Sequence, residues 1–197
     1  MNLPNKLSMF RIILVPVLVL VYIFPYAQLM IDVPVFHFGA TSLSMVNIVC
    51  LIIFAVASIT DFLDGYIARK NNLITSFGKF IDPIADKLLV NTSFILLAFN
   101  AQVPMVAVLI MIWRDTIVDA IRMMASTKGK VMAAGMLGKA KTVTQMVAII
   151  FAFLNNIPFA FINLPVTTIL VWAACVISVL SGVSYFMQAK DVLMETM

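Results

Sequence analysis

The sequence predicts an all-α integral membrane protein with six transmembrane helices in a single domain, residues 1–197. Hydrophobic residues make up 63% of the chain, and the mean hydropathy is +1.09. Charged residues make up only 11%, whereas soluble domains carry about 25%. Runs of about 20 apolar residues, the length that crosses a bilayer, recur along the chain. The composition therefore excludes an ordinary soluble domain.

The first apolar run follows a basic start, MNLPNKLSMFRI, which we expect to form an N-terminal interfacial arm on the lipid headgroups. No small-residue cleavage site follows this run, so we do not expect a signal peptide. Short connectors that contain Pro, Gly or Asn separate the later runs. The expected spans are residues 8–30, 43–64, 80–100, 103–125, 140–162 and 165–187.

The basic residues predict how the chain is oriented. Every second connector, around 31–42, 99–104 and 155–165, contains no Lys or Arg. The other connectors and both ends are basic, which is the positive-inside pattern. Both termini are therefore predicted to be cytoplasmic. The net charge of +4 indicates attraction to anionic membrane lipids. No aromatic–basic motif is present, so nucleic acid is not an expected partner.

Four aspartates flank the connector between the second and third expected spans: Asp61, Asp64, Asp82 and Asp86. In an antiparallel hairpin, residues equally far from the turn lie at equal depth, so all four share one layer near the cytoplasmic face. The spacings of three and four residues direct each pair from one helix face. A charged aspartate at the centre of a membrane helix costs roughly 2.5–3.5 kcal/mol, which makes these carboxylates functional candidates. Taken singly, each could instead be an interfacial charge paired with a nearby Lys or Arg.

Four carboxylates in one low-dielectric layer repel one another unless cations bind between them. Oxygen ligands suit Mg²⁺ or Mn²⁺. Such an ion takes one or two carboxylates together with substrate phosphates, so the four aspartates predict two ions. Two ions about 3.5–4 Å apart can stabilise both the attacking and the leaving oxygen of a phosphoryl displacement.

Two glycines accompany the aspartates. Gly78 lies on one helical stripe with Asp82 and Asp86, and Gly65 lies beside the first aspartate pair. Glycine in a helix interior costs roughly 1 kcal/mol relative to alanine, so each needs a reason. A bare backbone would let a flat base or a diphosphate approach closely. Arg69, one turn past Gly65, can offer its planar guanidinium to a phosphate.

The pattern Asp61-x-x-Asp64-Gly65-x-x-Ala68-Arg69, then eight residues, then Gly78-x-x-x-Asp82-x-x-x-Asp86 resembles the signature of the CDP-alcohol phosphatidyltransferases. The stretches NLPNKLSMFRI, GKFIDPIADKLL, RDTIVDAIRMMASTKGKVMAAGMLGKAKTVTQM and SGVSYF extend the resemblance over nearly the whole chain. They are similar to the bacterial members that transfer a phosphatidyl group from CDP-diacylglycerol to sn-glycerol 3-phosphate and release CMP. The resemblance implies a six-helix bundle in the bacterial plasma membrane, usually a homodimer, with its polar site facing the cytoplasm.

The resemblance also implies roles for individual residues. The metal ligands are Asp61, Asp64, Asp82 and Asp86, and Asp86 is also the general base that takes the proton of the glycerol 1-hydroxyl. The residues that match CDP contacts are Gly65, Ala68, Arg69 and Gly78. Asn5 and Arg11 match positions near the substrate entrance; the alternative for both is a place on an interfacial helix.

The phosphate of the acceptor requires cations, which are supplied near the same layer by Arg114, Arg122, Lys139 and Lys141. The alternative for Arg114 is a structural ion pair with Asp115 or Asp119. Similar members of the family usually carry Glu at position 115 and a small residue at position 119. Because these two acids offset part of the positive charge, the alternative acceptors inositol phosphate, serine or a phosphatidyl lipid stay open.

A divalent-cation transporter is the rival hypothesis from another functional class. Transporters place ion sites near the bilayer centre, often between inverted repeats. Here the aspartates are expected near one face, and the sequence contains no repeat. Release of CMP from CDP-diacylglycerol in the presence of glycerol 3-phosphate distinguishes the two hypotheses.

Overall fold

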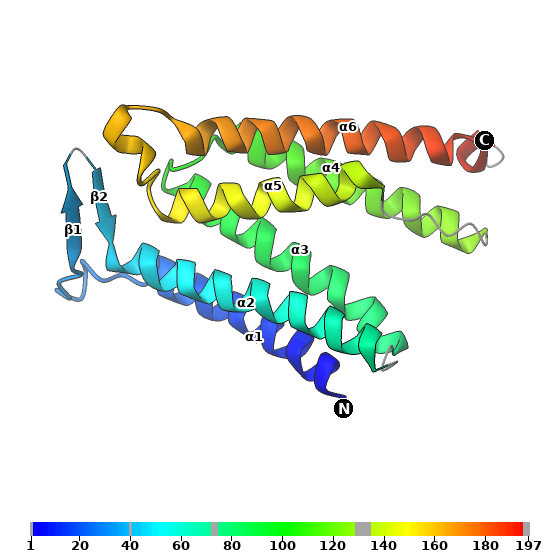
Figure 1. The fold of residues 1–197 in the computed structure, drawn as a ribbon, viewed down its shortest axis with the longest axis horizontal. Coiled ribbons are helices and arrows are strands. Elements are labelled where there is room, and N and C mark those ends of the chain that lie inside the picture. Colours follow the sequence, from blue (N-terminus) through cyan, green and yellow to red (C-terminus); the bar gives the residue numbers. More distant parts are fainter. Residues whose placement is uncertain (1, 40, 72–74, 129–134, 195–197) are drawn as a thin grey trace.

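The computed structural model describes residues 2–39, 41–71, 75–128 and 135–194. Within these residues, long helices form a bundle with a β-hairpin at one end (Figure 1). The helices are α1 (Leu3–Ile23), α2 (Met45–Lys70), α3 (Ser76–Phe99), α4 (Met105–Thr127), α5 (Met136–Phe153) and α6 (Val166–Met194). A short 3₁₀ helix, η1 (Phe159–Ile162), precedes α6.

The helices form two groups that α3 connects. Helix α1 packs along α2, whereas α4 and α5 both pack along α6. Helix α3 runs diagonally between the groups and contacts α1 and α2 on one side and α4 and α5 on the other (Figure 1). Both chain ends lie toward the end of the bundle opposite the hairpin. Side chains of α3 can therefore take part in sites on both groups.

The predicted N-terminal arm is not a separate element. Helix α1 begins at Leu3, because Pro4 occupies the first turn, where proline loses no helical hydrogen bond. It ends at Ile23, just before Pro25, rather than at residue 30. Its first turns pack against protein: Asn5 and Arg11 are both buried. Helix α1 therefore runs through the stretch in which the arm was expected, and contact of this stretch with lipid headgroups stays a prediction.

The expected connector 31–42 contains a β-hairpin, which the sequence analysis missed. Strands β1 (Val35–Phe38) and β2 (Thr41–Ser44) pair antiparallel, with Val35 opposite Ser44. Gly39 has a φ of +59° at the turn, a conformation that suits glycine. Ser44 also caps α2, because its hydroxyl oxygen accepts a hydrogen bond from the Val46 amide at 3.2 Å.

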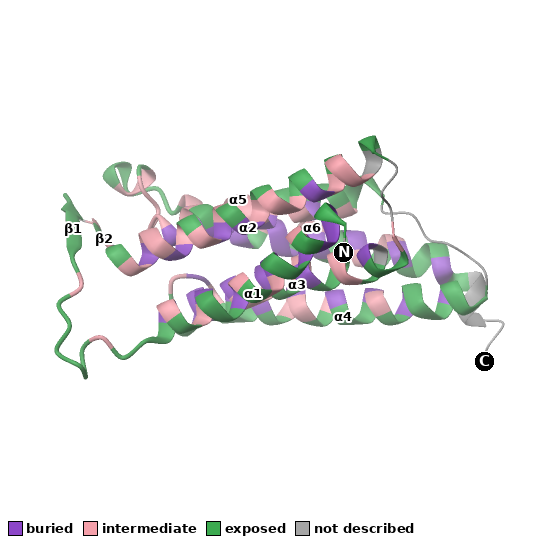
Figure 2. Ribbon diagram, turned by 90° about the horizontal axis from the view of Figure 1, so that it is seen from below, coloured by how far each residue is buried: buried purple, intermediate pink, exposed green. Residues whose placement is uncertain are grey.

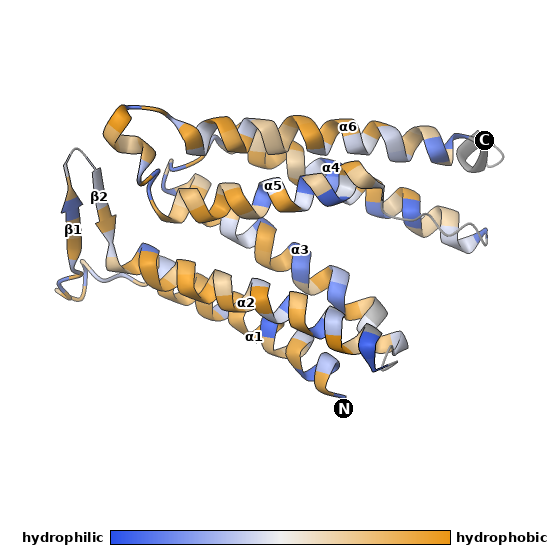
Figure 3. Ribbon diagram, viewed as in Figure 1, coloured by the Kyte–Doolittle hydropathy of each residue, from blue (hydrophilic) through white to orange (hydrophobic). Residues whose placement is uncertain are grey.

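The surface of the bundle is apolar, as expected for a membrane protein. Orange, hydrophobic residues cover most of the helix surfaces in Figure 3, and many of the outward positions are exposed in Figure 2. Leu20 is 69% exposed and Phe99 is 75% exposed. Large exposed apolar surfaces are rare on soluble monomers. The membrane class is therefore confirmed.

Among the described residues, four helices are long and apolar enough to cross a membrane: α1, α2, α5 and α6. Helices α3 and α4 do not meet this criterion, although both are of spanning length. The physical reason is their charge, since α3 carries Asp82 and Asp86 while α4 carries Arg114 and Asp115. The two helices that depart from a membrane composition both contribute residues to the candidate site.

Candidate active site

The aspartate cluster lies where α1 crosses the ends of α2 and α3. Asp61 and Asp64 are on α2, and Asp82 is on α3. The hydroxyl of Ser8, on α1, donates to Asp82 Oδ1 at 2.6 Å and lies 3.4 Å from Asp64 Oδ2. The structure thus brings Asp64 and Asp82 close together around Ser8, in line with the hairpin count. Ser8 is a member of the site that the sequence analysis missed.

Arg11 is fully buried inside this cluster. Its Nη1 lies 2.5 Å from Asp61 Oδ1, and its Nη2 lies 2.5 Å from Asp64 Oδ2. The side chain is 0% exposed. The spacing of three residues from Ser8 places both on one face of α1. Arg11 therefore lies among the aspartates, and its place near a substrate entrance stays a prediction.

The arrangement of the carboxylates bears on the predicted metal site. Within the described residues, no three His, Cys, Asp or Glu side chains form a group that could hold a metal ion as they stand. The cation between Asp61 and Asp64 is the guanidinium of Arg11. The donor atoms are nevertheless carboxylate oxygens, which are the ligands that Mg²⁺ and Mn²⁺ take. The chemistry of the residues fits such an ion, with Arg11 in its place.

The residues predicted to contact CDP lie beside the cluster. Gly65 and Ala68 are half-buried on α2, and the side chain of Arg69 lies outside the described residues. Gly78 is buried at the start of α3. A Cβ at position 78 would lie 3.1 Å from Oδ1 of Asn5. One reason for this glycine is therefore the close approach of α1.

Asn5 connects α1 to the beginning of α3. Its Oδ1 accepts a hydrogen bond from the Thr75 hydroxyl at 3.0 Å. The same Thr75 oxygen caps α3, since it accepts from the Gly78 amide at 3.0 Å. Asn5, like Arg11, is buried.

A second polar site, the basic pocket, lies between α3, α4, α5 and α6. It encloses about 180 Å³. Three of the four residues predicted to bind the acceptor phosphate line it, namely Arg114, Arg122 and Lys141. The fourth, Lys139, is exposed and is not part of the lining. Other residues that line the pocket are Asp86, Lys87, Asp115, Asp119, Gln145 and Tyr185.

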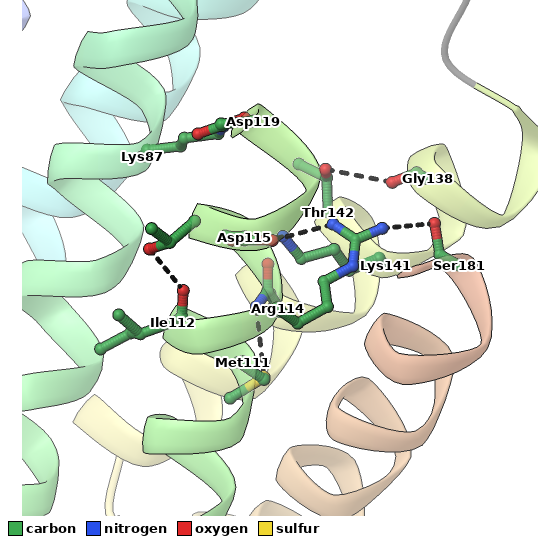
Figure 4. A network of polar contacts seen from close by, with 12 residues as sticks. Lys87, Met111, Ile112, Arg114, Asp115, Asp119, Gly138, Lys141, Thr142 and Ser181 are labelled. Atoms are coloured by element: carbon green, nitrogen blue, oxygen red, sulfur yellow. Dashed lines mark hydrogen bonds and ion pairs between the residues drawn. The ribbon is translucent and has the colours of Figure 1, made fainter. Parts of the chain in front are cut away.

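Two acids of α4, the buried Asp115 and the partly exposed Asp119, pair with cations of this pocket (Figure 4). Asp115 is 5% exposed; its Oδ1 lies 2.9 Å from Arg114 Nη1, and its Oδ2 lies 2.5 Å from Lys141 Nζ. Asp119 pairs with Lys87 on α3. Of the alternatives for Arg114, the ion pair with Asp115 is therefore present, and Asp119 has a different partner.

Helix α6 also contacts Arg114. Nη2 of Arg114 donates to the Ser181 hydroxyl at 2.7 Å, and the guanidinium lies 5.7 Å from the centre of the Tyr185 ring. Gly182 makes room for this side chain, because a Cβ there would lie 3.0 Å from Cγ of Arg114. The stretch SGVSYF, already notable in the sequence, contributes these contacts.

Asp86 stands between the two sites. It follows Asp82 by one turn of α3 and lines the basic pocket. Its carboxylate interacts electrostatically with Asp61 on one side and with Lys141 on the other. One turn of helix separates its position from the aspartate cluster by about 6 Å along the axis. A group at this place can act on a molecule in the pocket while it faces the carboxylates.

Comparison with known proteins agrees with this geometry. The sequence profile described as CDP-alcohol phosphatidyltransferase matches residues 1–180. A protein of Bacillus subtilis named CDP-diacylglycerol–glycerol-3-phosphate 3-phosphatidyltransferase is 39% identical over 185 residues, which cover 94% of this chain and 93% of that protein. A protein of Rickettsia bellii with the same name is 36% identical, with 96% of each chain covered. One of Salmonella choleraesuis, also so named, is 36% identical and covers 75% of this chain and 74% of its own length.

Proposed function

This chain belongs to the CDP-alcohol phosphatidyltransferase family, and on that premise we propose that it transfers a phosphatidyl group from CDP-diacylglycerol to sn-glycerol 3-phosphate. The products are phosphatidylglycerophosphate and CMP. The observation that carries the proposal is the place of Asp86, which lines the basic pocket and lies one turn of α3 from Asp82 of the aspartate cluster. The relatives that cover nearly the whole chain carry the name of this activity.

The basic pocket supplies a site for the acceptor. Arg122 can offer two parallel hydrogen bonds to a phosphate, while Arg114 and Lys141 add positive charge. Asp115 pairs with Lys141, so an acceptor phosphate would compete with Asp115 for that cation. A cavity of about 180 Å³ is large enough for a molecule of the size of glycerol 3-phosphate.

The transfer needs a base at the hydroxyl of the acceptor. Asp86 takes the proton of the 1-hydroxyl, and the hydroxyl oxygen forms a bond with the phosphorus that carries diacylglycerol. The bond from that phosphorus to the CMP oxygen breaks, and CMP leaves with the electron pair. Positioned carboxylates serve as general bases in this manner when they lie within hydrogen-bond reach of the proton.

The aspartate cluster supplies a site for the donor. Asp61, Asp64, Asp82 and Asp86 would hold Mg²⁺ or Mn²⁺, two ions in our proposal. Such ions neutralise a diphosphate and a departing nucleotide. Gly65, Ala68, Arg69 and Gly78 would lie along the CDP moiety. Ser8 of α1 would keep Asp82 oriented, since its hydroxyl donates to that carboxylate.

The proposal includes the cellular setting. We place all six long helices in the plasma membrane, with both termini and the site on the cytoplasmic side, and we expect a homodimer. The absence of Lys and Arg from the connectors at the hairpin end supports this orientation.

The proposed activity is tested with the purified protein in proteoliposomes. We expect CMP release from CDP-diacylglycerol when glycerol 3-phosphate is present, and no comparable release with serine or inositol phosphate. Equal rates with serine would contradict glycerol 3-phosphate as the acceptor, but would not contradict the membership of the chain in the family. Absence of CMP release with every acceptor would remove the proposed activity itself.

A further inference from the structure

Arg11 presents a physical problem that the proposed reaction does not address. A fully buried guanidinium lies between Asp61 and Asp64, where the proposed function requires a divalent cation. An arginine and a metal ion cannot both occupy the space between two carboxylates. Either Arg11 holds the pair permanently and the ion binds elsewhere, or Arg11 gives way.

Two observations favour the second possibility. The Nε atom of Arg11 is buried and has no hydrogen-bond partner among the described residues. Buried polar groups with a single permanent position are nearly always paired. In addition, one guanidinium neutralises only one of the two carboxylate charges of Asp61 and Asp64 that it contacts, so the pair retains an excess of negative charge.

The Arg11 side chain can move while helix α1 stays in place. Arginine has a long flexible side chain, and only its two terminal nitrogens are paired with the aspartates. The rest of α1 is attached to α3 independently, through Ser8 to Asp82 and through Asn5 to Thr75. Arg11 can thus leave the aspartates without separating α1 from the site.

We propose that Arg11 is a resident counter-ion that occupies the Asp61–Asp64 pair in the metal-free protein and withdraws when a divalent cation binds there. This inference depends on the metal part of the proposed function. The displaced guanidinium remains close to the site, where it is available to a phosphate of the donor. Arg11 would then lower the affinity of the free protein for metal and prevent repulsion between the empty carboxylates.

The test is the direct binding of Mn²⁺ to the purified full-length protein, without either substrate, measured by the loss of the free-Mn²⁺ electron paramagnetic resonance signal. Arg11→Met removes the charge and keeps a long apolar stem. Since hydrogen bonds to charged groups are each worth about 1.5–3 kcal/mol, we expect Mn²⁺ to bind at least about tenfold more tightly. The matched control is Lys6→Gln, which removes a charge from an exposed position on the same helix and should change the affinity less than twofold.

Thermal unfolding provides a second readout. In EDTA, Arg11→Met should melt at a lower temperature than the wild type, because Asp61 and Asp64 then repel without a cation between them. Mn²⁺ should raise its melting temperature by more than it raises that of the wild type. Arg11→Lys keeps one charge but cannot contact both carboxylates with two nitrogens, so its Mn²⁺ affinity should fall between the two. Arg11→Lys is also the variant to measure if Arg11→Met does not fold.

Unchanged or weaker Mn²⁺ binding by Arg11→Met and Arg11→Lys would overturn the inference, since it would make Arg11 a permanent positioning residue. Failure of the wild type and both variants to bind Mn²⁺ would overturn both the inference and the metal part of the proposed function. A wild type that binds Mn²⁺ but releases no CMP would instead contradict the proposed activity alone.

Discussion

The aspartate cluster and the basic pocket both hold charged side chains inside the bundle, mainly carboxylates in the cluster and mainly cations in the pocket. Each gathers like charges in a bundle that is apolar on the outside, and each contains a buried counter-ion, Arg11 in the cluster and Asp115 in the pocket. The cluster is closed around Arg11, which is 0% exposed, whereas the pocket encloses a cavity of about 180 Å³. The comparison teaches that the pocket has room for a small anion, whereas the space between Asp61 and Asp64 is filled by the guanidinium of Arg11.

The two sites also differ in what the removal of a partner would do. Leaving a buried charge without its counter-ion typically costs 3–5 kcal/mol, more than the pair itself contributes. Substitutions at Arg11 or Asp115 therefore affect stability as well as activity. Residues at the edge of each site test function with less interference from folding.

The largest expected effect comes from removing divalent cations, which tests the cluster alone. Transfer should fall to background in EDTA and return with Mg²⁺ or Mn²⁺. Ca²⁺ should restore less activity, because it prefers longer bonds and more ligands than Mg²⁺. The assay is CMP release in proteoliposomes at constant ionic strength. Full activity in chelator would refute the assignment of Asp61, Asp64, Asp82 and Asp86 to metal.

Asp86→Asn should have the next largest effect, because it removes the residue that joins the two sites. A neutral amide cannot accept the proton of the acceptor hydroxyl, and general bases typically contribute about 10²- to 10⁴-fold. We expect kcat to fall by that range while binding of CDP-diacylglycerol changes little. The matched control is Asp32→Asn, an exposed aspartate before the β-hairpin, which should leave kcat unchanged. A kcat for Asp86→Asn near that of the wild type would exclude Asp86 as the base.

A smaller effect is expected at the rim of the basic pocket. Arg122 is exposed and lines the pocket, whereas Lys139 is exposed outside its lining. Loss of one hydrogen bond to a charged group costs about 1.5–3 kcal/mol, so Arg122→Gln should lower kcat/KM for glycerol 3-phosphate about tenfold to a hundredfold. Lys139→Gln removes the same charge and should change kcat/KM less than threefold. Equal losses in the two variants would indicate a general charge effect instead of a phosphate contact.

The smallest effect is expected beside the cluster, at Gly78. An added Cβ would lie 3.1 Å from Oδ1 of Asn5 and 3.3 Å from Oγ1 of Thr75. Overpacking costs about 1–3 kcal/mol, and the better helix propensity of alanine returns about 1 kcal/mol. Gly78→Ala should therefore lower the melting temperature slightly. The double variant Asn5→Ala/Gly78→Ala relieves the contact. The steric explanation is excluded if Gly78→Ala alone has no effect and the double variant also melts no higher than Asn5→Ala.

Sequence reasoning predicted the parts of the molecule that depend on composition and local spacing. The membrane class follows from hydropathy, and the approach of Asp64 to Asp82 follows from counting along a helical hairpin. The length of α1 was misjudged because Pro4 and Pro25 fix its ends, and hydropathy alone does not weigh those signals. The β-hairpin was missed because Val35–Phe38 is short and lies between apolar runs.

The unpredicted parts of the site depend on contacts between distant segments. The sequence marked Arg11 as a functional position, but nothing in its spacing placed it between Asp61 and Asp64. The partners of Asp115 and Asp119 likewise come from other helices, Lys141 on α5 and Lys87 on α3. Such pairs are decided by helix packing, which a single sequence does not specify.

The central claim is that the basic pocket presents a phosphate-bearing acceptor to Asp86, and the most direct test compares glycerol 3-phosphate with glycerol. Both molecules offer the same attacking hydroxyl, so the ratio of their kcat/KM values isolates the phosphate contacts. Loss of two hydrogen bonds to charged groups should cost about two to four powers of ten. For the wild-type protein in proteoliposomes, with CMP release as the readout, the kcat/KM for glycerol 3-phosphate should exceed that for glycerol by about two to four powers of ten. A ratio near one would contradict it, because the cations of the pocket would then have no part in selecting the acceptor.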